Sequence, residues 1–131
     1  FLISISGSEL NAVGTFSKAL GFDAWVGQVQ YVHDGKKLTG EVQTLGQSKD
    51  VILDALIMKF QLDSKNSMAV GDTSSDIPVL QKVENPIVFN PNQALFKVAR
   101  DNGWMVIIER KDMVYGLSME NGNYILKTVN V

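Results

Sequence analysis

The sequence MAVGDTSSD, residues 68–76, sets the architecture that we expect for the whole chain. Its apolar start, residues 68–70, predicts a buried parallel strand that ends where a glycine lets the backbone turn. Residues 74–76 then favour the cap of a helix. Asp72 and Asp76 would therefore lie in one strand-to-helix loop, in the crevice outside the strand ends where open α/β sheets bind ligands.

The two carboxylates of this loop repel each other unless a cation or a proton lies between them. A site lined by hard oxygen ligands suits Mg²⁺ together with phosphate. Asp72 and Asp76 are therefore candidate metal ligands. An acidic turn that only caps a helix is the alternative, and this short motif does not separate the two readings by itself.

The composition indicates one ordinary folded domain, with 131 residues, 45% hydrophobic and 20% charged. A net charge of −2 without a basic block argues against nucleic acid or a membrane surface as a partner. No apolar stretch approaches the roughly 20 residues needed to cross a bilayer. The lack of cysteine excludes disulfides and thiolate chemistry, which fits a cytoplasmic location.

Residues 1–5 predict a second buried strand, and the sequence Ser-Gly-Ser at residues 6–8 ends it. We expect Ser8 to cap a helix that stops at Gly21. The apolar face of that helix should contain four residues: Leu10, Val13, Ser17 and Leu20. Because hydroxyls and helix-terminal N–H groups favour negative charge, this loop is a candidate anion site, with plain helix capping as the alternative.

A β-hairpin is predicted next, because the β-rich runs 25–32 and 37–45 are joined by His-Asp-Gly-Lys at residues 33–36. His33 is the only histidine of the chain. No second metal ligand lies near it in the sequence, so we expect it to be solvated rather than to bind a metal.

Ser48 is expected to open a helix that places Ile52, Leu56 and Phe60 toward the core. Lys49 then falls at the first helical position, where a cation opposes the helix dipole. A lysine aimed at a phosphate would neutralise its oxygens, which would explain this placement. A solvated lysine that costs a few tenths of a kcal/mol is the alternative.

Strands and helices alternate after residue 76, which predicts a parallel sheet with helical crossovers. The expected elements are a helix through Leu80 and Val83, a strand over 86–89, a turn at 90–92, a helix that stops at Gly103, and a strand over 104–109. A closing hairpin should follow, with strands over 114–119 and 124–129.

Taken together, the motifs resemble motifs II, III and IV of the haloacid dehalogenase superfamily in order and approximate spacing: Ser6-Gly7, Lys49, and Gly71-Asp72-x-x-x-Asp76. The sequences of residues 34–40 and 90–104 resemble the phosphoserine-phosphatase-like branch. The resemblance covers nearly the whole chain. It implies a doubly wound, Rossmann-like α/β fold, a three-layer sandwich with a mainly parallel sheet plus β-hairpins.

This resemblance also implies a chemistry, that of a Mg²⁺-dependent phosphatase acting on a small phosphorylated metabolite. Ser6, Gly7 and Lys49 would bind the phosphoryl group, with Ser6 and Lys49 as the catalytic residues of this chain. Asp72 would ligate Mg²⁺, and Asp76 would support the metal site. These roles agree with the reading of the residues, since phosphoryl transfer depends mainly on positioning and on charge neutralisation.

The family's Asp-x-Asp motif, which supplies the nucleophile and the general acid, occurs nowhere in the 131 residues. Related proteins carry it on a strand between those that match residues 1–5 and 68–70. We therefore expect a single domain, residues 1–131, that is the carboxyl-terminal part of the catalytic core without this strand and without the cap. Its parts would be the motif II strand and helix (1–22), the hairpin (23–46) and the remaining core (47–131).

An inactive chain is the expected consequence, because unpaired backbone at the centre of a sheet costs on the order of 1–3 kcal/mol for each buried group. An upstream segment or a separate chain carrying Asp-x-Asp should complete the sheet. Phosphoserine itself is a doubtful substrate, since Ser75 replaces an asparagine that phosphoserine phosphatases usually have.

Two other classes of function stay open. A non-catalytic relative would keep the phosphate and metal pocket without turnover. A receiver-like signalling domain fits less well, because its acidic cluster lies near the first strand and its lysine comes late, whereas Lys49 precedes Asp72 here.

Overall fold

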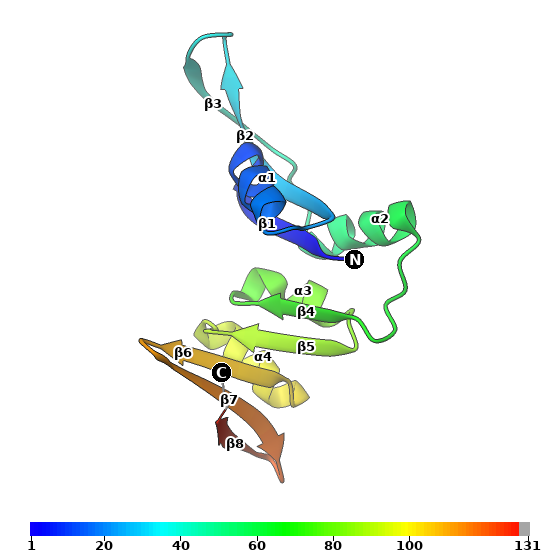
Figure 1. The fold of residues 1–131 in the computed structure, drawn as a ribbon, viewed down its shortest axis with the longest axis vertical. Coiled ribbons are helices and arrows are strands. Elements are labelled where there is room, and N and C mark those ends of the chain that lie inside the picture. The colour runs from blue at the N-terminus through cyan, green and yellow to red at the C-terminus, as the bar shows by residue number, and fades with distance from the viewer. Residues whose placement is uncertain (129–131) are drawn as a thin grey trace. The chain divides into compact units, whose positions relative to one another are not determined.

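The computed structural model describes residues 1–128 and divides the chain into two compact units, Phe1–Leu62 and Asp63–Val131. Each unit contains its own sheet, with the strand order β1-β2-β3 in the first and β4-β5-β6-β7-β8 in the second (Figure 1). The boundary between the units falls inside the interval 47–131. No helix among the described residues is long and apolar enough to cross a membrane.

The first unit has a strand-helix-strand beginning, a hairpin and a second helix. β1 and β2 pair in parallel, and β2 and β3 pair antiparallel. The elements are β1 (Ile3–Glu9), α1 (Leu10–Ala19), β2 (Ala24–His33), β3 (Leu38–Thr44) and α2 (Lys49–Phe60).

Helix α1 packs through a narrower face than the sequence predicts. Val13 and Ser17 are buried as expected, but the side chain of Leu20 is 69% exposed, so its assignment to the apolar face is wrong. Leu20 is already the C-cap residue, beyond the last helical turn that faces the sheet. Gly21 has φ +76° and ends the helix as predicted.

The predicted hairpin of β2 and β3 is confirmed. One carboxylate oxygen of Asp34 accepts hydrogen bonds from the main-chain N–H groups of Lys36 and Lys37, at 3.0 and 2.9 Å. The bonds from Lys37 and Lys36 hold the pKa of Asp34 below its usual value. His33 ends β2 and is exposed, which confirms that it is solvated.

The second unit follows the predicted β-α-β-α-β order. β4, β5 and β6 pair in parallel, and β7 and β8 extend the sheet as antiparallel strands. The elements are β4 (Met68–Gly71), η1 (Ser74–Asp76), α3 (Ile77–Leu80), β5 (Asn85–Phe89), α4 (Gln93–Asn102), β6 (Met105–Arg110), β7 (Met113–Glu120) and β8 (Asn123–Thr128). Helix α3 ends at Leu80, before the predicted Val83, and Val129 lies outside the described residues.

The core of the second unit lies between the sheet and helices α3 and α4. Both crossovers, β4 to β5 and β5 to β6, step in the same direction along the sheet, and right-handed connections place such helices on one face. The buried cluster that they form contains five residues: Leu80, Val88, Leu95, Ala99 and Val106.

Residues 68–70 form the predicted strand, but the prediction that this strand is buried is wrong. Met68 and Val70 are 63% and 62% exposed, because they point away from the core that Ala69 contacts. β4 also pairs only with β5 among the described residues, which makes it an edge strand.

The first predicted strand also differs from its expected burial. β1 spans Ile3–Glu9, so the prediction that residues 6–8 end this strand is wrong. The strand begins at Ile3, and the side chains of Phe1 and Leu2 are exposed. Within the described residues β1 pairs only with β2. Each sheet therefore ends in a strand of a parallel pair whose outer edge has no partner strand in the described part of the chain.

Candidate functional site

The loop after β4 is built around the carboxylate of Asp76. Its Oδ2 accepts hydrogen bonds from the main-chain N–H groups of Asp72 and Thr73, at 3.1 and 3.0 Å, and from the Thr73 hydroxyl at 3.1 Å. Asp76 is only 8% exposed. The carboxylate thus closes the loop on itself and brings Asp76 into direct contact with the backbone of Asp72.

Thr73, and not residues 74–76, is the cap of the helical segment that follows. Thr73 and Asp76 form a capping box, in which each side chain bonds the main-chain N–H of the other residue. The spacing Thr-x-x-Asp is the sequence signal that could have revealed it, since an acidic residue three positions after a threonine completes such a box.

Gly71 is required here by close packing, and not by an unusual backbone angle. A Cβ atom at this position would lie 2.5 Å from the Cβ and 2.9 Å from the Cγ of Asp76. Any side chain at residue 71 would push Asp76 away from the loop. The Gly-Asp-x-x-x-Asp spacing therefore has a steric reason in the structure.

Asp72 presents its side chain at the carboxyl end of β4. The residue is exposed, while its backbone is held on both sides. Its N–H donates to Asp76, and its carbonyl oxygen accepts a hydrogen bond of 3.0 Å from the main-chain N–H of Asn92. Sequence reasoning treated residues 90–92 only as a turn and missed this contact.

The bulged end of β1, residues 6–9, contains the other predicted strand-end group. The register of β1 against β2 shifts between Ser6 and Glu9, which marks a β-bulge at the candidate residues. The Ser6 hydroxyl oxygen accepts a hydrogen bond of 3.1 Å from the Ser8 N–H. Gly7 is exposed, and a Cβ added there would meet no atom within 4 Å.

Glu9, and not Ser8, caps helix α1, so that prediction is wrong. The Glu9 carboxylate accepts hydrogen bonds from the Ala12 N–H at 2.8 Å and from the Asn11 side chain at 2.9 Å. Main-chain bonds from Asn11 and Ala12 lower the pKa of Glu9. Glutamate is not a preferred N-cap residue, which is why the sequence favoured the serine. The Ala12 N–H is therefore already bound and is not open to another anion.

Lys49 is the first residue of α2, as predicted, and Ser48 occupies the N-cap position without a side-chain cap bond. The first unit thus holds Ser6, Gly7 and Lys49, and the second holds Asp72 and Asp76. The structure brings Asp76 and Asp72 together directly, through the hydrogen bond from the Asp72 N–H.

The donor set of the β4 loop fits part of a magnesium site. Among residues 1–128 there is no group of three or more histidine, cysteine, aspartate or glutamate side chains that could hold a metal ion. Mg²⁺ commonly uses one or two protein carboxylates and fills its other positions with phosphate oxygens and water. The exposed Asp72 carboxylate, supported by Asp76, matches that limited requirement.

Comparison with known proteins shows which proteins this chain is similar to. No family model matches the chain. It is 31% identical over 108 residues to a Streptomyces azureus protein named for the inhibition of morphological differentiation, covering 81% of this chain and 38% of that protein. It is 30% identical over 109 residues to a phosphoserine phosphatase of Mycobacterium tuberculosis, covering 81% and 34%. The chain thus spans little more than a third of the length of these relatives.

Two solved structures of phosphoserine phosphatase resemble the fold. The phospho-aspartyl intermediate analogue has a TM-score of 0.68 and 25% identity, covering 84% of this chain and 51% of that one. The apo form has a TM-score of 0.64 and 26% identity, covering 72% and 48%. The chain belongs to the haloacid dehalogenase superfamily. Within it, the chain resembles the phosphoserine-phosphatase-like branch.

Proposed function

We propose that this chain is part of a Mg²⁺-dependent phosphatase that hydrolyses a phosphomonoester of a small metabolite. The observation that carries the proposal is the loop after β4, where Asp72 has an exposed carboxylate and a backbone bonded on both sides. A carboxylate held in this way at a strand end suits a metal that must meet a phosphate. The phosphatase relatives support the same reading.

Each proposed site residue has a definite task in this chemistry. The Ser6 hydroxyl and the Gly7 N–H would donate to phosphate oxygens. The Lys49 ammonium would neutralise their charge, an attraction of roughly 4 kcal/mol before desolvation at 4 Å and an effective dielectric of about 20. Mg²⁺, when bound, would offset the negative charge of the phosphate during transfer. Asp72 would hold that ion, and Asp76 would keep Asp72 in place.

We further propose that the nucleophile, an aspartate that becomes phosphorylated, comes from an Asp-x-Asp segment upstream or from a separate chain. Within the described residues, β1 and β4 each have one edge without a partner strand, which supports this proposal. A strand added beside β4 would satisfy its open backbone groups. The 131 residues alone should then be inactive. A cytoplasmic location stays a prediction.

The test compares Asp72→Asn with Asp112→Asn in the complete protein, assayed on p-nitrophenyl phosphate with and without Mg²⁺. Both changes remove one exposed carboxylate, but Asp112 lies in the turn between β6 and β7. We expect Asp72→Asn to lower Mg²⁺-dependent hydrolysis by about 100-fold or more, and Asp112→Asn to leave it within about twofold of the parent.

Two results would count against the proposal. Mg²⁺-dependent hydrolysis that persists in Asp72→Asn would remove Asp72 from the metal site. A complete protein that contains Asp-x-Asp, binds Mg²⁺ and shows no turnover would instead favour the non-catalytic relative.

A further inference from the structure

We propose that Asn92 is a positioning residue for Asp72 and that it raises the affinity of the site for Mg²⁺. This inference rests on the proposed function, because it assumes that Asp72 is a metal ligand. It concerns a residue in the turn between β5 and α4, outside the Gly-Asp-x-x-x-Asp motif.

The first step is that the backbone of Asp72 is fixed at both of its peptide groups. Its N–H donates to Asp76 Oδ2 at 3.1 Å, and its carbonyl accepts from the Asn92 N–H at 3.0 Å. These two bonds restrain rotation on either side of the Asp72 Cα atom. They therefore set the direction in which the exposed carboxylate leaves the backbone. Loss of the Asn92 bond would leave Asp72 tied on one side only.

The second step is that Asn92 is itself anchored to the core. Its side-chain oxygen accepts from the Leu95 N–H at 2.9 Å, and its carbonyl accepts from the Phe96 N–H at 2.9 Å. Asn92 is thus the N-cap of α4, and Leu95 in the first turn of that helix is fully buried. The cap holds the Asn92 N–H at a fixed place relative to the core.

Asn90 fixes the other end of the same turn. It has φ +43°, its N–H donates to the Ile107 carbonyl at 2.9 Å, and its side-chain oxygen accepts from the Glu109 N–H at 2.8 Å. The turn is therefore attached to β6 through Asn90 and to α4 through Asn92. A metal ligand bonded to such a turn has little freedom to move.

Three substitutions at residue 92 in the complete protein separate the two bonds. Asn92→Ser keeps a capping oxygen, and Asn92→Ala removes it. Asn92→Pro lacks the cap as well and also removes the N–H that bonds Asp72. Proline suits this residue, whose φ is −68°. The comparison of proline with alanine thus measures the bond to Asp72, and that of alanine with serine measures the cap.

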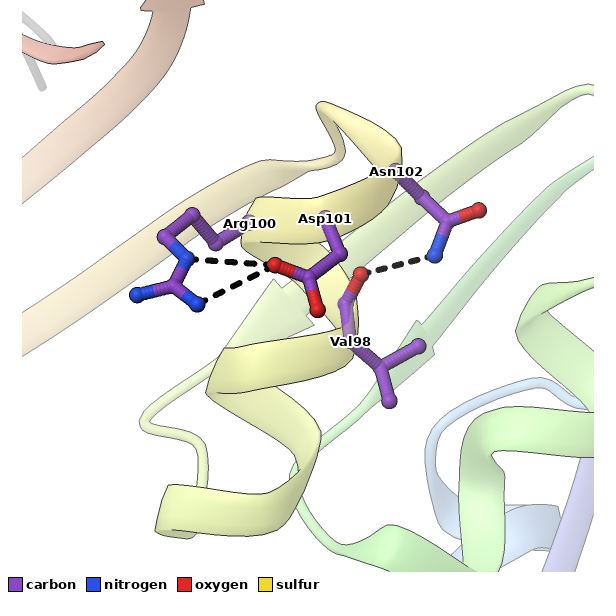
Figure 2. A network of polar contacts seen from close by, with 4 residues as sticks. All are labelled: Val98, Arg100, Asp101 and Asn102. Carbon is purple, nitrogen blue, oxygen red and sulfur yellow. Dashed lines mark hydrogen bonds and ion pairs between the residues drawn. The ribbon is translucent and has the colours of Figure 1, made fainter. Parts of the chain in front are cut away.

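Asn102→Ala is the matched control at the opposite end of the same helix. The Asn102 side-chain amide donates to the Val98 carbonyl at 2.8 Å, and the contact lies beside the Arg100–Asp101 ion pair (Figure 2). Asn102→Ala removes one asparagine hydrogen bond from α4 and leaves the hydrogen bonds to Asp72 in place. It reports what a purely structural loss in α4 does to metal binding.

The measurements are the Mg²⁺ dissociation constant by titration calorimetry, the Mg²⁺ concentration for half-maximal hydrolysis, and Tm in EDTA. We expect Asn92→Pro to weaken Mg²⁺ binding about 10-fold or more relative to Asn92→Ala, in the range found when residues that orient metal ligands are lost. Asn92→Ala should bind Mg²⁺ about threefold more weakly than the parent. Asn92→Ser and Asn102→Ala should stay within about twofold.

Equal Mg²⁺ affinity of the proline and alanine variants would overturn the inference, even if Tm falls. If the proline variant does not fold, the alanine and serine variants decide: equal affinity with a lower Tm for alanine shows a purely structural residue. A parent protein that binds no Mg²⁺ would reject the proposed function, and the inference with it.

Discussion

The bulged end of β1, residues 6–9, and the loop after β4 connect a strand to a helical segment in different ways. Each connects a parallel strand to a helical segment, and each uses its own acidic side chain to bind main-chain N–H groups near the helix start. In the loop after β4 the carboxylate of Asp76 is buried and faces back toward the strand end. At the bulged end of β1 the carboxylate of Glu9 lies at the surface and bonds forward to α1.

Gly71 and Gly7 differ in the same way in the space around them. Gly71 is in contact with Asp76, so the shape of the β4 loop follows from packing within the protein. Gly7 has open space where a side chain would be, so a ligand can approach the backbone there. Under the proposed function, the loop after β4 would fix a metal ligand, and the bulged end of β1 would leave room for a phosphate.

The largest effect is expected from Asp76→Ala. The substitution leaves the N–H groups of Asp72 and Thr73 without their acceptor in a part-buried loop. An unsatisfied donor that is buried costs about 1–3 kcal/mol. We expect the free energy of unfolding to fall by about 2–4 kcal/mol. Urea denaturation of the complete protein in EDTA measures it, because EDTA removes any contribution of bound metal.

Glu9→Ala is the control for this prediction. It removes the corresponding carboxylate from the bulged end of β1, but water can reach the donor that it leaves, so its urea midpoint should fall less than that of Asp76→Ala. Equal losses in the two variants would contradict the view that the β4 loop is the more tightly determined of the two.

A second, somewhat smaller effect is expected from Gly71→Ala. The added Cβ would lie 2.5 Å from Asp76 Cβ, a side-chain atom next to the backbone that cannot move independently of η1. Overpacking of this kind costs about 1–3 kcal/mol. Gly7→Ala should change the free energy of unfolding by no more than about 0.5 kcal/mol, because its Cβ meets no atom. The same urea titration compares the two, and an equal response would show that Asp76 yields to the new methyl group.

The order and type of the elements could be predicted from the sequence because local signals agree with the fold. Asp34-Gly35 marks a hairpin, Gly103 with φ +69° ends α4, and Lys49 begins α2. The carboxylates of Asp72 and Asp76 could be placed in one loop for the same reason. Their spacing is short, and the strand before them is apolar.

Burial and capping could not be predicted as well, because they depend on partners distant in sequence. Residues 68–70 have the apolar composition of a central strand, and the strand order of the described residues is what shows that β4 pairs on one side only. The hydrogen bond from the Asn92 N–H to the Asp72 carbonyl joins residues 20 positions apart. Both groups belong to the main chain, so the residue types do not indicate the bond. Glu9 caps α1 although serine is the commoner residue at that position.

The smallest effect is a pH dependence that belongs to Glu9, the last residue of β1. Hydrogen bonds from Asn11 and Ala12 lower the pKa of Glu9 below its usual 4.5. A lowered pKa means that the folded state favours the ionised carboxylate. This contribution to stability is therefore present above pH 4.5 and is lost as the pH falls through the folded-state pKa.

Glu9→Gln tests this dependence, because glutamine cannot ionise. The urea midpoint of the variant should lie below that of the parent at neutral pH, and the two should converge as the pH falls below 4.5. Asp34→Asn is the control for acid sensitivity elsewhere, since the pKa of Asp34 is also lowered, by the turn of the hairpin. If the difference between parent and Glu9→Gln stays constant down to about pH 3, Glu9 stabilises α1 without its charge. The cap of α1 would then be a neutral hydrogen bond, and a negative phosphate near Gly7 would meet no fixed charge at the start of the helix.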